Sequence, residues 1–115
     1  MSSHTEVLER YLDGFRNGDH EAILACLTDD VVWNIHGVRT THGKEEFDSE
    51  VENPDFRGLP QLTVHRTIEH EDVLVVTGSG NGQLWDGGPF NFEFNDIFTF
   101  RDGLIAQLDS YLVQV

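Results

Sequence analysis

The most unusual chemistry-bearing residue of the sequence is an aspartate inside a run of phenylalanines, FEFNDIFTF, where the aspartate is Asp96. Side chains alternate across a β-strand, so Asp96 shares one face of this segment with Phe92, Phe94, Phe98 and Phe100. An ionised carboxyl group is costly in such surroundings and must be paired, hydrogen-bonded or protonated. Asp96 is either a satisfied core residue or, the interpretation we favour, an acid held in an apolar pocket, because folding requires no carboxyl group there.

Tyr11 is the second residue whose type and position favour chemistry. It lies on the apolar stripe of a helix predicted over residues 5–17, the element expected to face the sheet. A buried tyrosine hydroxyl usually finds a hydrogen-bond partner, and Asp96 is available for that role. The simpler alternative is a core aromatic residue with no part in a reaction.

The other reactive side chains form no pattern. Cys26 lies in an apolar stretch and is expected to be a buried, inert thiol. A single cysteine also excludes an intrachain disulfide and a thiolate metal cluster. The histidines lack the close spacing of a metal-binding pair, so we expect no metal site and no cofactor.

The charge balance excludes two classes of partner. The 115 residues include 7 Lys+Arg and 21 Asp+Glu, a net charge of −14, and such a chain is repelled by phosphate backbones and anionic lipids. We therefore expect neither nucleic acid nor membrane as a partner. The sequence shows no signal-peptide pattern and no run of the ~18 apolar residues that a membrane helix needs. The expectation is a cytoplasmic protein with a single domain over residues 1–115.

The elements that must hold these residues follow from hydrophobic periodicity and turn signals. Three helices are predicted: over residues 5–17, from the cap Asp19 to the tandem Asp29-Asp30, and over 43–52, where Asn53-Pro54 ends the helix. Strands are predicted over residues 31–36, 62–70, 73–85, 90–101 and 104–115.

The order of these elements predicts an α+β fold. The last four strands, joined by tight turns, must form an antiparallel meander, and the N-terminal helices must cover one of its faces. A twisted sheet kinked by glycines curls around its helix and leaves an internal pocket. The glycines of the strand over residues 73–85, namely Gly78, Gly80 and Gly82, either enlarge that pocket or mark close helix packing.

The segment ERYLDGFRNGDHEAILACLTDDVVW, residues 9–33, resembles the opening of the nuclear transport factor 2-like superfamily. An amphipathic helix, a Gly-Asp turn, a second helix and a tandem Asp lead there into the first strand. Gly43 at the start of the third helix and the closing DIFTFRDGLI extend the resemblance over nearly the whole chain. It implies the cystatin-like cone-shaped barrel with an internal pocket and, within the superfamily, the SnoaL-like or ketosteroid isomerase-like group. That fold serves isomerases, cyclases, dehydratases, epoxide hydrolases and non-catalytic binding proteins.

Similarity to ketosteroid isomerase implies roles for two residues. Tyr11 and Asp96 fall on the tyrosine and the protonated aspartate of its oxyanion hole, which implies a donor pair able to polarise a carbonyl or enolate oxygen. The position of that enzyme's general base is occupied here by Ile35, which cannot take a proton, so we expect no true steroid isomerase. His36 could serve as a base if Gly37 lets the strand bulge into the pocket; the alternative is a surface residue.

The predicted pocket is mostly apolar, as small-molecule sites are. Its lining is expected to come from Phe15, Trp33, Ile35, Phe94, Phe98, Leu108, Ser110 and Leu112. We expect an enzyme that performs cofactor-free isomerisation, cyclisation or dehydration on a small or polycyclic hydrophobic compound with a carbonyl or hydroxyl group. The alternatives are a non-catalytic small-molecule-binding protein, which Ile35 favours, and an assembly dimer whose pocket has no function.

A homodimer is expected as well. The convex face of the long strands is predicted to carry apolar residues among polar neighbours, which is too apolar a surface to face water alone. The residues assigned to that face are Leu74, Val76, Leu84 and Ile97.

Overall fold

The computed structural model describes residues 3–52 and 58–115. Its helices are α1 (Ser3–Asn17), α2 (His20–Leu24) and α3 (Gly43–Val51), and its strands are β1 (Leu27–Ile35), β2 (Arg39–His42), β3 (Gln61–His70), β4 (Val73–Leu84), β5 (Gly88–Arg101) and β6 (Leu104–Gln114). The predicted helix stop at Asn53-Pro54 lies outside the described residues. Within those residues, no helix has the length and apolar character needed to cross a membrane.

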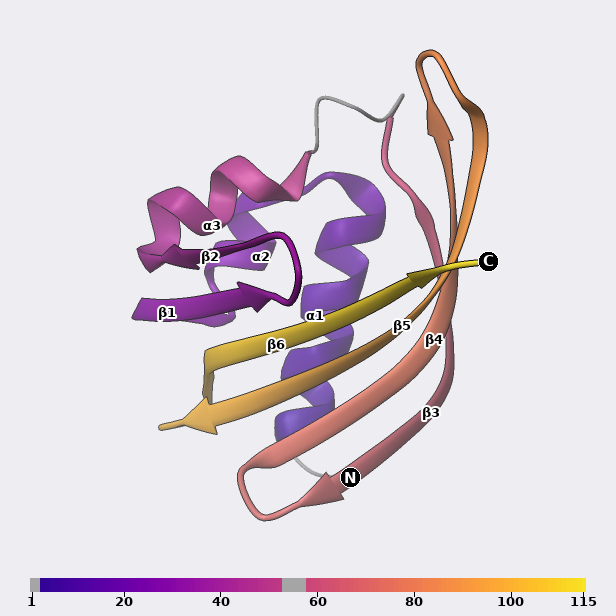
Figure 1. Cartoon of the computed structure of the whole chain (residues 1–115). Helices are drawn as coiled ribbons and strands as arrows, with labels where there is room; N and C mark the ends of the chain where they lie inside the picture. The colour runs from indigo at the N-terminus through magenta and orange to yellow at the C-terminus, as the bar shows by residue number, and fades with distance from the viewer. Residues whose placement is uncertain (1–2, 53–57) are drawn as a thin grey trace.

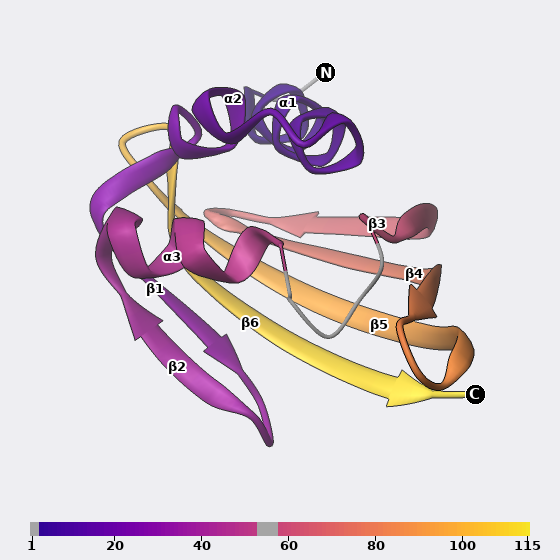
Figure 2. The same ribbon diagram turned by 90° about the horizontal axis from the view of Figure 1, so that it is seen from above.

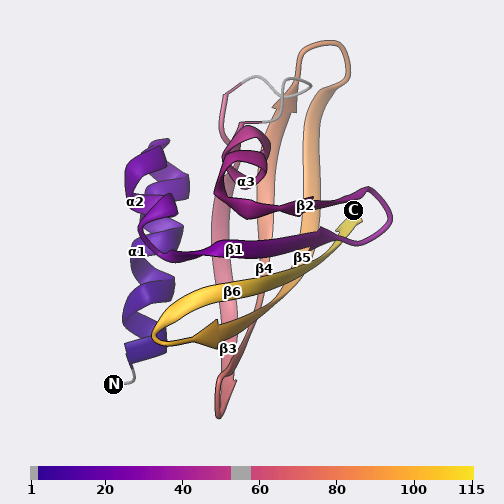
Figure 3. The same ribbon diagram turned by 90° about the vertical axis from the view of Figure 1, so that its left-hand side faces the viewer.

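One six-stranded sheet, in the order β2-β1-β6-β5-β4-β3, forms the body of the molecule. Strands β3 to β6 form the predicted antiparallel meander, and β1 joins it by pairing with β6 in parallel. The sheet curls so that the three helices lie on its concave side (Figures 1 and 2). Seen from the side, α3 lies over the hairpin of β1 and the unpredicted strand β2 (Figure 3). The predicted α+β fold is confirmed, with a mixed sheet in place of a wholly antiparallel one.

The first strand starts earlier than predicted. Asp19 caps α2, and its side chain accepts a hydrogen bond from the Ala22 amide at 3.1 Å, but this helix already ends at Leu24. Asp29 and Asp30 therefore lie inside β1, where the sequence pattern placed them at a helix end. Both are exposed at a point where the pairing of β1 with β6 shifts register. This bulge lets the strand carry two adjacent charges without burying either.

The core lies between α1 and the concave face of the sheet. Leu74 and Val76 are each only 1% exposed and belong to this core, so their assignment to the convex face is wrong. Leu74 pairs directly with Phe98, and Val76 pairs with Asp96. Directly paired residues project to the same face of a sheet, so Leu74 and Val76 must point inward with the phenylalanine side chains.

Gly78 and Gly80 of β4 make room for aromatic rings from β5. They pair directly with Phe94 and Phe92, respectively. A Cβ atom on Gly78 would lie 2.7 Å from the Phe94 ring and 2.3 Å from the Thr63 carbonyl oxygen, and a Cβ atom on Gly80 would lie 2.1 Å from the Phe92 ring. Close helix packing is therefore not the role of these two glycines. Each lets a ring from the neighbouring strand lie over the β4 backbone, where it forms part of the floor of a cavity.

Candidate active-site pocket

A cavity of about 190 Å³ opens between α1, α3 and the concave face of the sheet. Its walls are mainly aromatic and aliphatic, and the oxygen-bearing side chains at it are those of Tyr11, Glu50, Asp96 and Ser110. The complete lining is Tyr11, Leu12, Phe15, Trp33, Ile35, Glu50, Val51, Gly58, Leu59, Pro60, Leu62, Phe90, Phe92, Phe94, Asp96, Ser110 and Leu112.

Most of the residues predicted for the pocket do line this cavity. They are Tyr11, Phe15, Trp33, Ile35, Phe94, Asp96, Ser110 and Leu112. Phe98 and Leu108 do not line it, because they pair with each other across β5 and β6 and are completely buried in the core. Leu112 is 51% exposed and therefore lies at the rim of the cavity.

Asp96 lies in the middle of β5, at the cavity wall. Burial among the phenylalanines raises its pKa from 3.8 to about 7, and a hydrogen bond from the Ser110 hydroxyl opposes part of that rise. Ser110 is the direct partner of Asp96 on β6, and its Oγ accepts a hydrogen bond from Trp33 Nε1 at 2.9 Å. Because Trp33 donates to this oxygen, the Ser110 proton is left to point at Asp96. Asp96 is half-buried, since the cavity still gives it a path to solvent.

Tyr11 reaches the same cavity from α1 and is 3% exposed. Burial raises the pKa of its hydroxyl well above the ordinary value, and the nearby charges of Asp96 and Cys26 add to that rise. Its ring packs edge-on against Phe98 at 5.4 Å between ring centroids. The hydroxyl is therefore neutral and able to donate a hydrogen bond. We expected it to bond Asp96, but the hydrogen-bond partner of Asp96 is Ser110 instead.

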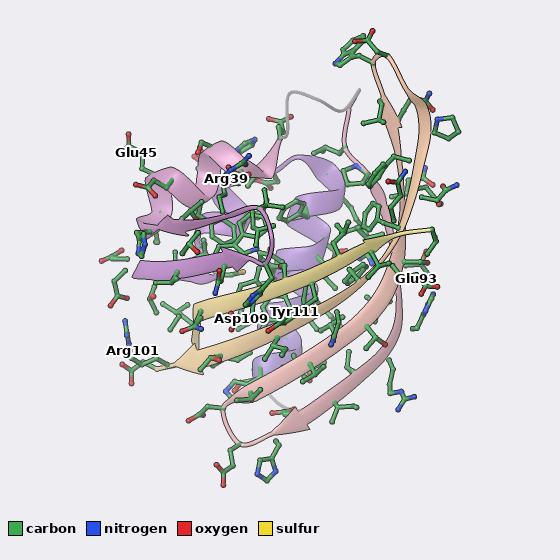
Figure 4. The ribbon with its side chains drawn as sticks, in the orientation of Figure 1. Arg39, Glu45, Glu93, Arg101, Asp109 and Tyr111 are labelled. Atoms are coloured by element: carbon green, nitrogen blue, oxygen red, sulfur yellow. The ribbon has the colours of Figure 1, made fainter. Side chains whose placement is uncertain are left out.

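Glu50 of α3 is a cavity residue that the sequence interpretation missed. Its side chain is 16% exposed, and Arg39 Nη1 donates to its two carboxylate oxygens at 2.6 and 2.8 Å. Figure 4 shows Arg39 lying against α3, whereas Glu45 of the same helix points away from the protein. The signal was present in the sequence, because Glu50 follows Phe47 by three residues and therefore borders the buried stripe of the helix.

His36 does not reach the cavity, so its proposed place as a base in the pocket is wrong. It lies on the outer face of the sheet, where its Nε2 is 3.0 Å from Asp109 Oδ1 and its ring stacks on Tyr111 at 4.1 Å between centroids. Figure 4 shows Asp109 and Tyr111 on that outer face of β6. The reason is strand alternation: Ile35 points into the cavity, so the next residue points away from it.

The structure also describes the surroundings of Cys26 and of the side chains that could bind a metal ion. Cys26 is buried, and burial raises the pKa of its thiol, as expected for an inert cysteine. Over residues 3–52 and 58–115, no group of three or more His, Cys, Asp or Glu side chains is placed to hold a metal ion.

Comparison with known proteins agrees with this architecture. A search of curated protein sequences finds no significant match. An NTF2-like protein of unknown function from Burkholderia pseudomallei superposes with a TM-score of 0.92 at 21% identity, over 98% of this chain and 92% of the other. An LEH-like epoxide hydrolase from Mycobacterium tuberculosis superposes with a TM-score of 0.83 at 17% identity, over 96% and 83%. A protein with a ketosteroid isomerase-like fold from Catenulispora acidiphila superposes with a TM-score of 0.82 at 15% identity, over 92% and 84%.

These structures share the fold, and their different names show that the fold alone assigns no reaction. The family comparison is more specific, because the model of the SnoaL-like domain matches residues 8–108. The chain therefore belongs to the SnoaL-like domain family.

Proposed function

We propose that this protein binds a small apolar compound with a carbonyl or hydroxyl group in its cavity. We propose further that it converts this compound by acid-base chemistry without a cofactor, as in isomerisation, cyclisation or dehydration. The observation that carries the proposal is Asp96, a carboxyl group with a pKa of about 7 at the wall of an apolar cavity. Such a group stays protonated at pH values where an ordinary aspartate is fully ionised, so it can donate a hydrogen bond.

The chemistry follows from two cavity groups that can donate a hydrogen bond, Tyr11 and, below about pH 7, Asp96. Asp96 and Tyr11 can each donate a hydrogen bond to an oxygen on which negative charge develops during a reaction. Between apolar walls, such donors act more strongly than they would in bulk water. The loss of one donor of this kind typically lowers kcat by ~10²–10³-fold. If a substrate carbonyl oxygen contacts Asp96, the enolate formed from that carbonyl would thus be stabilised.

The size of the cavity narrows the substrate class. Its volume of about 190 Å³ is below the ~300–1,000 Å³ typical of sites for drug-sized ligands. A compound of one or two rings fits this space better than a larger polycyclic one.

The alternative function is non-catalytic binding of a similar compound. Ile35 favours it, because the strand position where the resemblance implies a base carries an aliphatic side chain that faces the cavity. Under this alternative, Asp96 and Tyr11 would hold a ligand oxygen and no bond would change.

Binding of 2-tetralone tests the donor role of Asp96. This two-ring ketone has one oxygen, which can only accept a hydrogen bond. We expect it to bind about tenfold more tightly at pH 5.5 than at pH 8.5, because Asp96 loses its proton through about pH 7. Asp96→Asn keeps a donor and should bind equally at both pH values. Titration calorimetry that shows equal affinity of the wild-type protein at both pH values would remove the proposal.

We also propose a homodimer that forms through the outer face of β3 to β6. The outward positions at the centre of β4 and β5 carry no charge, in a chain whose net charge is −14. They are Val73, Val75 and Thr77 of β4 and their direct partners Thr99, Ile97 and Asn95 of β5. Ile68, Tyr111 and Val113 border them and are 49%, 43% and 64% exposed. A monomeric mass in sedimentation at micromolar concentration would exclude this dimer.

A further inference from the structure

Two carboxyl groups line the cavity, and their surroundings differ. Asp96 lies on the sheet among phenylalanine rings, and its pKa is raised by burial. Glu50 lies on α3 and is paired with a guanidinium group. Two carboxyl groups at one cavity, one of which is kept neutral while the other is paired with a cation, are an arrangement suited to acid and base roles.

The position of Glu50 is defined by its partner. Arg39 is the direct β2 partner of Ile35, and Ile35 lines the cavity. The guanidinium contacts both oxygens of Glu50 and so fixes the position of this carboxylate, which lines the same cavity as Ile35. The side chain of Glu50 is 16% exposed, compared with 40% for Asp48 of the same helix, and Glu45 and Glu46 are exposed. The other carboxylates of the helix thus have more contact with water than Glu50 does.

We propose that Glu50 is the general base of this site and that Arg39 positions it. The inference rests on the proposed function, because it assigns the proton acceptor that the Asp96 and Tyr11 donors require. A Glu50 oxygen takes the proton from the carbon next to the substrate carbonyl. The electron pair of that C–H bond forms the C=C bond of an enolate, and the carbonyl oxygen takes the negative charge. Asp96 donates a hydrogen bond to that oxygen, and protonated Glu50 returns the proton to carbon.

Hydrogen exchange into 2-tetralone tests the proposal without knowledge of the natural substrate. The benzylic C–H next to its carbonyl is acidic, and the same step in D₂O replaces this hydrogen by deuterium, which NMR follows over time. We expect the wild-type protein to accelerate the exchange above the rate in buffer. General-base catalysis typically contributes ~10²–10⁴-fold, so Glu50→Gln should lose at least about 100-fold of the protein-dependent rate. Equal protein-dependent rates for the wild-type protein and Glu50→Gln, at any level, overturn the proposal.

The matched control is Glu45→Gln. It makes the same chemical change on the same helix, at an exposed residue that points away from the cavity (Figure 4), and its exchange rate should stay within twofold of the wild-type rate. If Glu50→Gln fails to fold, the exchange rate with the Glu50→Asp protein tests the proposal instead. It keeps the charge for Arg39 and withdraws the carboxylate by one methylene, so at least a tenfold loss is expected. A wild-type rate for Glu50→Asp then overturns the proposal.

The pH profile separates Glu50 from Asp96 as the base. The titratable side chains at the cavity are Tyr11, Glu50 and Asp96, with Arg39 paired to Glu50. If Glu50 is the base, the protein-dependent exchange rate stays level or falls as pH rises through about 7, because Asp96 loses its donor proton. A rate that rises through about pH 7 would make Asp96 the base and overturn the proposal.

The binding experiment above distinguishes this failure from a failure of the proposed function. Glu50→Gln should still bind 2-tetralone more tightly at pH 5.5 than at pH 8.5, because the Asp96 donor is unchanged. Loss of exchange with intact, pH-dependent binding supports the base role of Glu50. If the affinity of the wild-type protein for 2-tetralone is the same at both pH values, the donor role of Asp96 is excluded. The comparison of exchange rates still tests Glu50 in that case.

Discussion

Two aspartates of the central strands lie on opposite faces of one sheet, and their surroundings differ. Asp96 of β5 faces the cavity among phenylalanine rings, with Ser110 as its hydrogen-bond donor. Asp109 of β6 lies on the outer face, where His36 is 3.0 Å from one carboxylate oxygen and Gln107 Nε2 donates to the other at 2.9 Å. Both carboxylate oxygens of Asp109 thus have a polar contact to a neighbouring side chain.

Limited exposure of an aspartate side chain does not by itself make it a functional acid. The side chain of Asp109 is only 17% exposed, yet polar neighbours contact both of its oxygens. Asp96 borders an apolar cavity, and its burial outweighs the single hydrogen bond that would favour the charged form. The number of donors around each carboxylate therefore matters as much as its access to water.

The largest expected effect is on the pH dependence of stability. The pKa of Asp96 rises from 3.8 to about 7 on folding, so between these pH values the folded protein binds more protons than the unfolded chain. Stability must then fall as pH rises from about 4 to about 7, by on the order of 4 kcal/mol, and the loss is complete above pH 7. Asp96→Asn should remove this loss, whereas Asp109→Asn should retain it. Urea unfolding at pH 4.5, 6 and 8 measures the difference, and parallel curves for the wild-type protein and Asp96→Asn would contradict it.

The second effect is the loss of stability when a side chain is added at Gly78 of β4, compared with a substitution at an outward residue of the same strand. Gly78→Ala places a methyl group 2.3 Å from the Thr63 carbonyl oxygen and 2.7 Å from the Phe94 ring. Because backbone cannot yield as a side chain can, we expect a loss of about 3 kcal/mol in the free energy of unfolding. The exposed outward residue Asn81 of the same strand supplies the control, since Asn81→Ala should change the free energy of unfolding by less than ~0.5 kcal/mol. A fully stable Gly78→Ala protein would mean that the sheet is not packed as described.

Much of this contrast could be predicted from the sequence because it depends on local periodicity. The alternation in β5 places Asp96 among the phenylalanines, and the turn signals define the meander. The parallel pairing of β1 with β6 joins segments far apart in the chain, and no local pattern reports it. The four residues of β2 have no apolar alternation. The pairing of Arg39 with Glu50 depends on how α3 lies over that hairpin. The spacing from Phe47 thus places Glu50 beside the buried stripe of α3, but it does not report the cation that pairs with Glu50.

A smaller effect tests the hydrogen-bond chain behind Asp96. Ser110→Ala removes the donor that lowers the pKa of Asp96, so this pKa should rise further above about 7. One hydrogen bond to a charged group is worth ~1.5 kcal/mol, or about one pH unit. Carboxyl-carbon NMR against pH measures the shift. An unchanged titration would show that Ser110 does not stabilise the carboxylate.

The smallest expected effect separates two neighbouring residues at the end of β1, Ile35 and His36, whose side chains lie on opposite faces of the sheet. His36→Ala removes a contact to Asp109 and a ring stacked on Tyr111, both at the outer face. Because a solvent-exposed contact of this kind contributes ~0–1 kcal/mol, we expect little loss of stability. The 2-tetralone affinity and exchange rate should stay within twofold of the wild-type values. Ile35→Ala, one position earlier, enlarges the cavity itself and should change the affinity by more than that. If His36→Ala lowered the exchange rate tenfold while Ile35→Ala left the affinity unchanged, the chemistry would have to lie on the outer face, and the assignment of the concave side as the active face would be wrong.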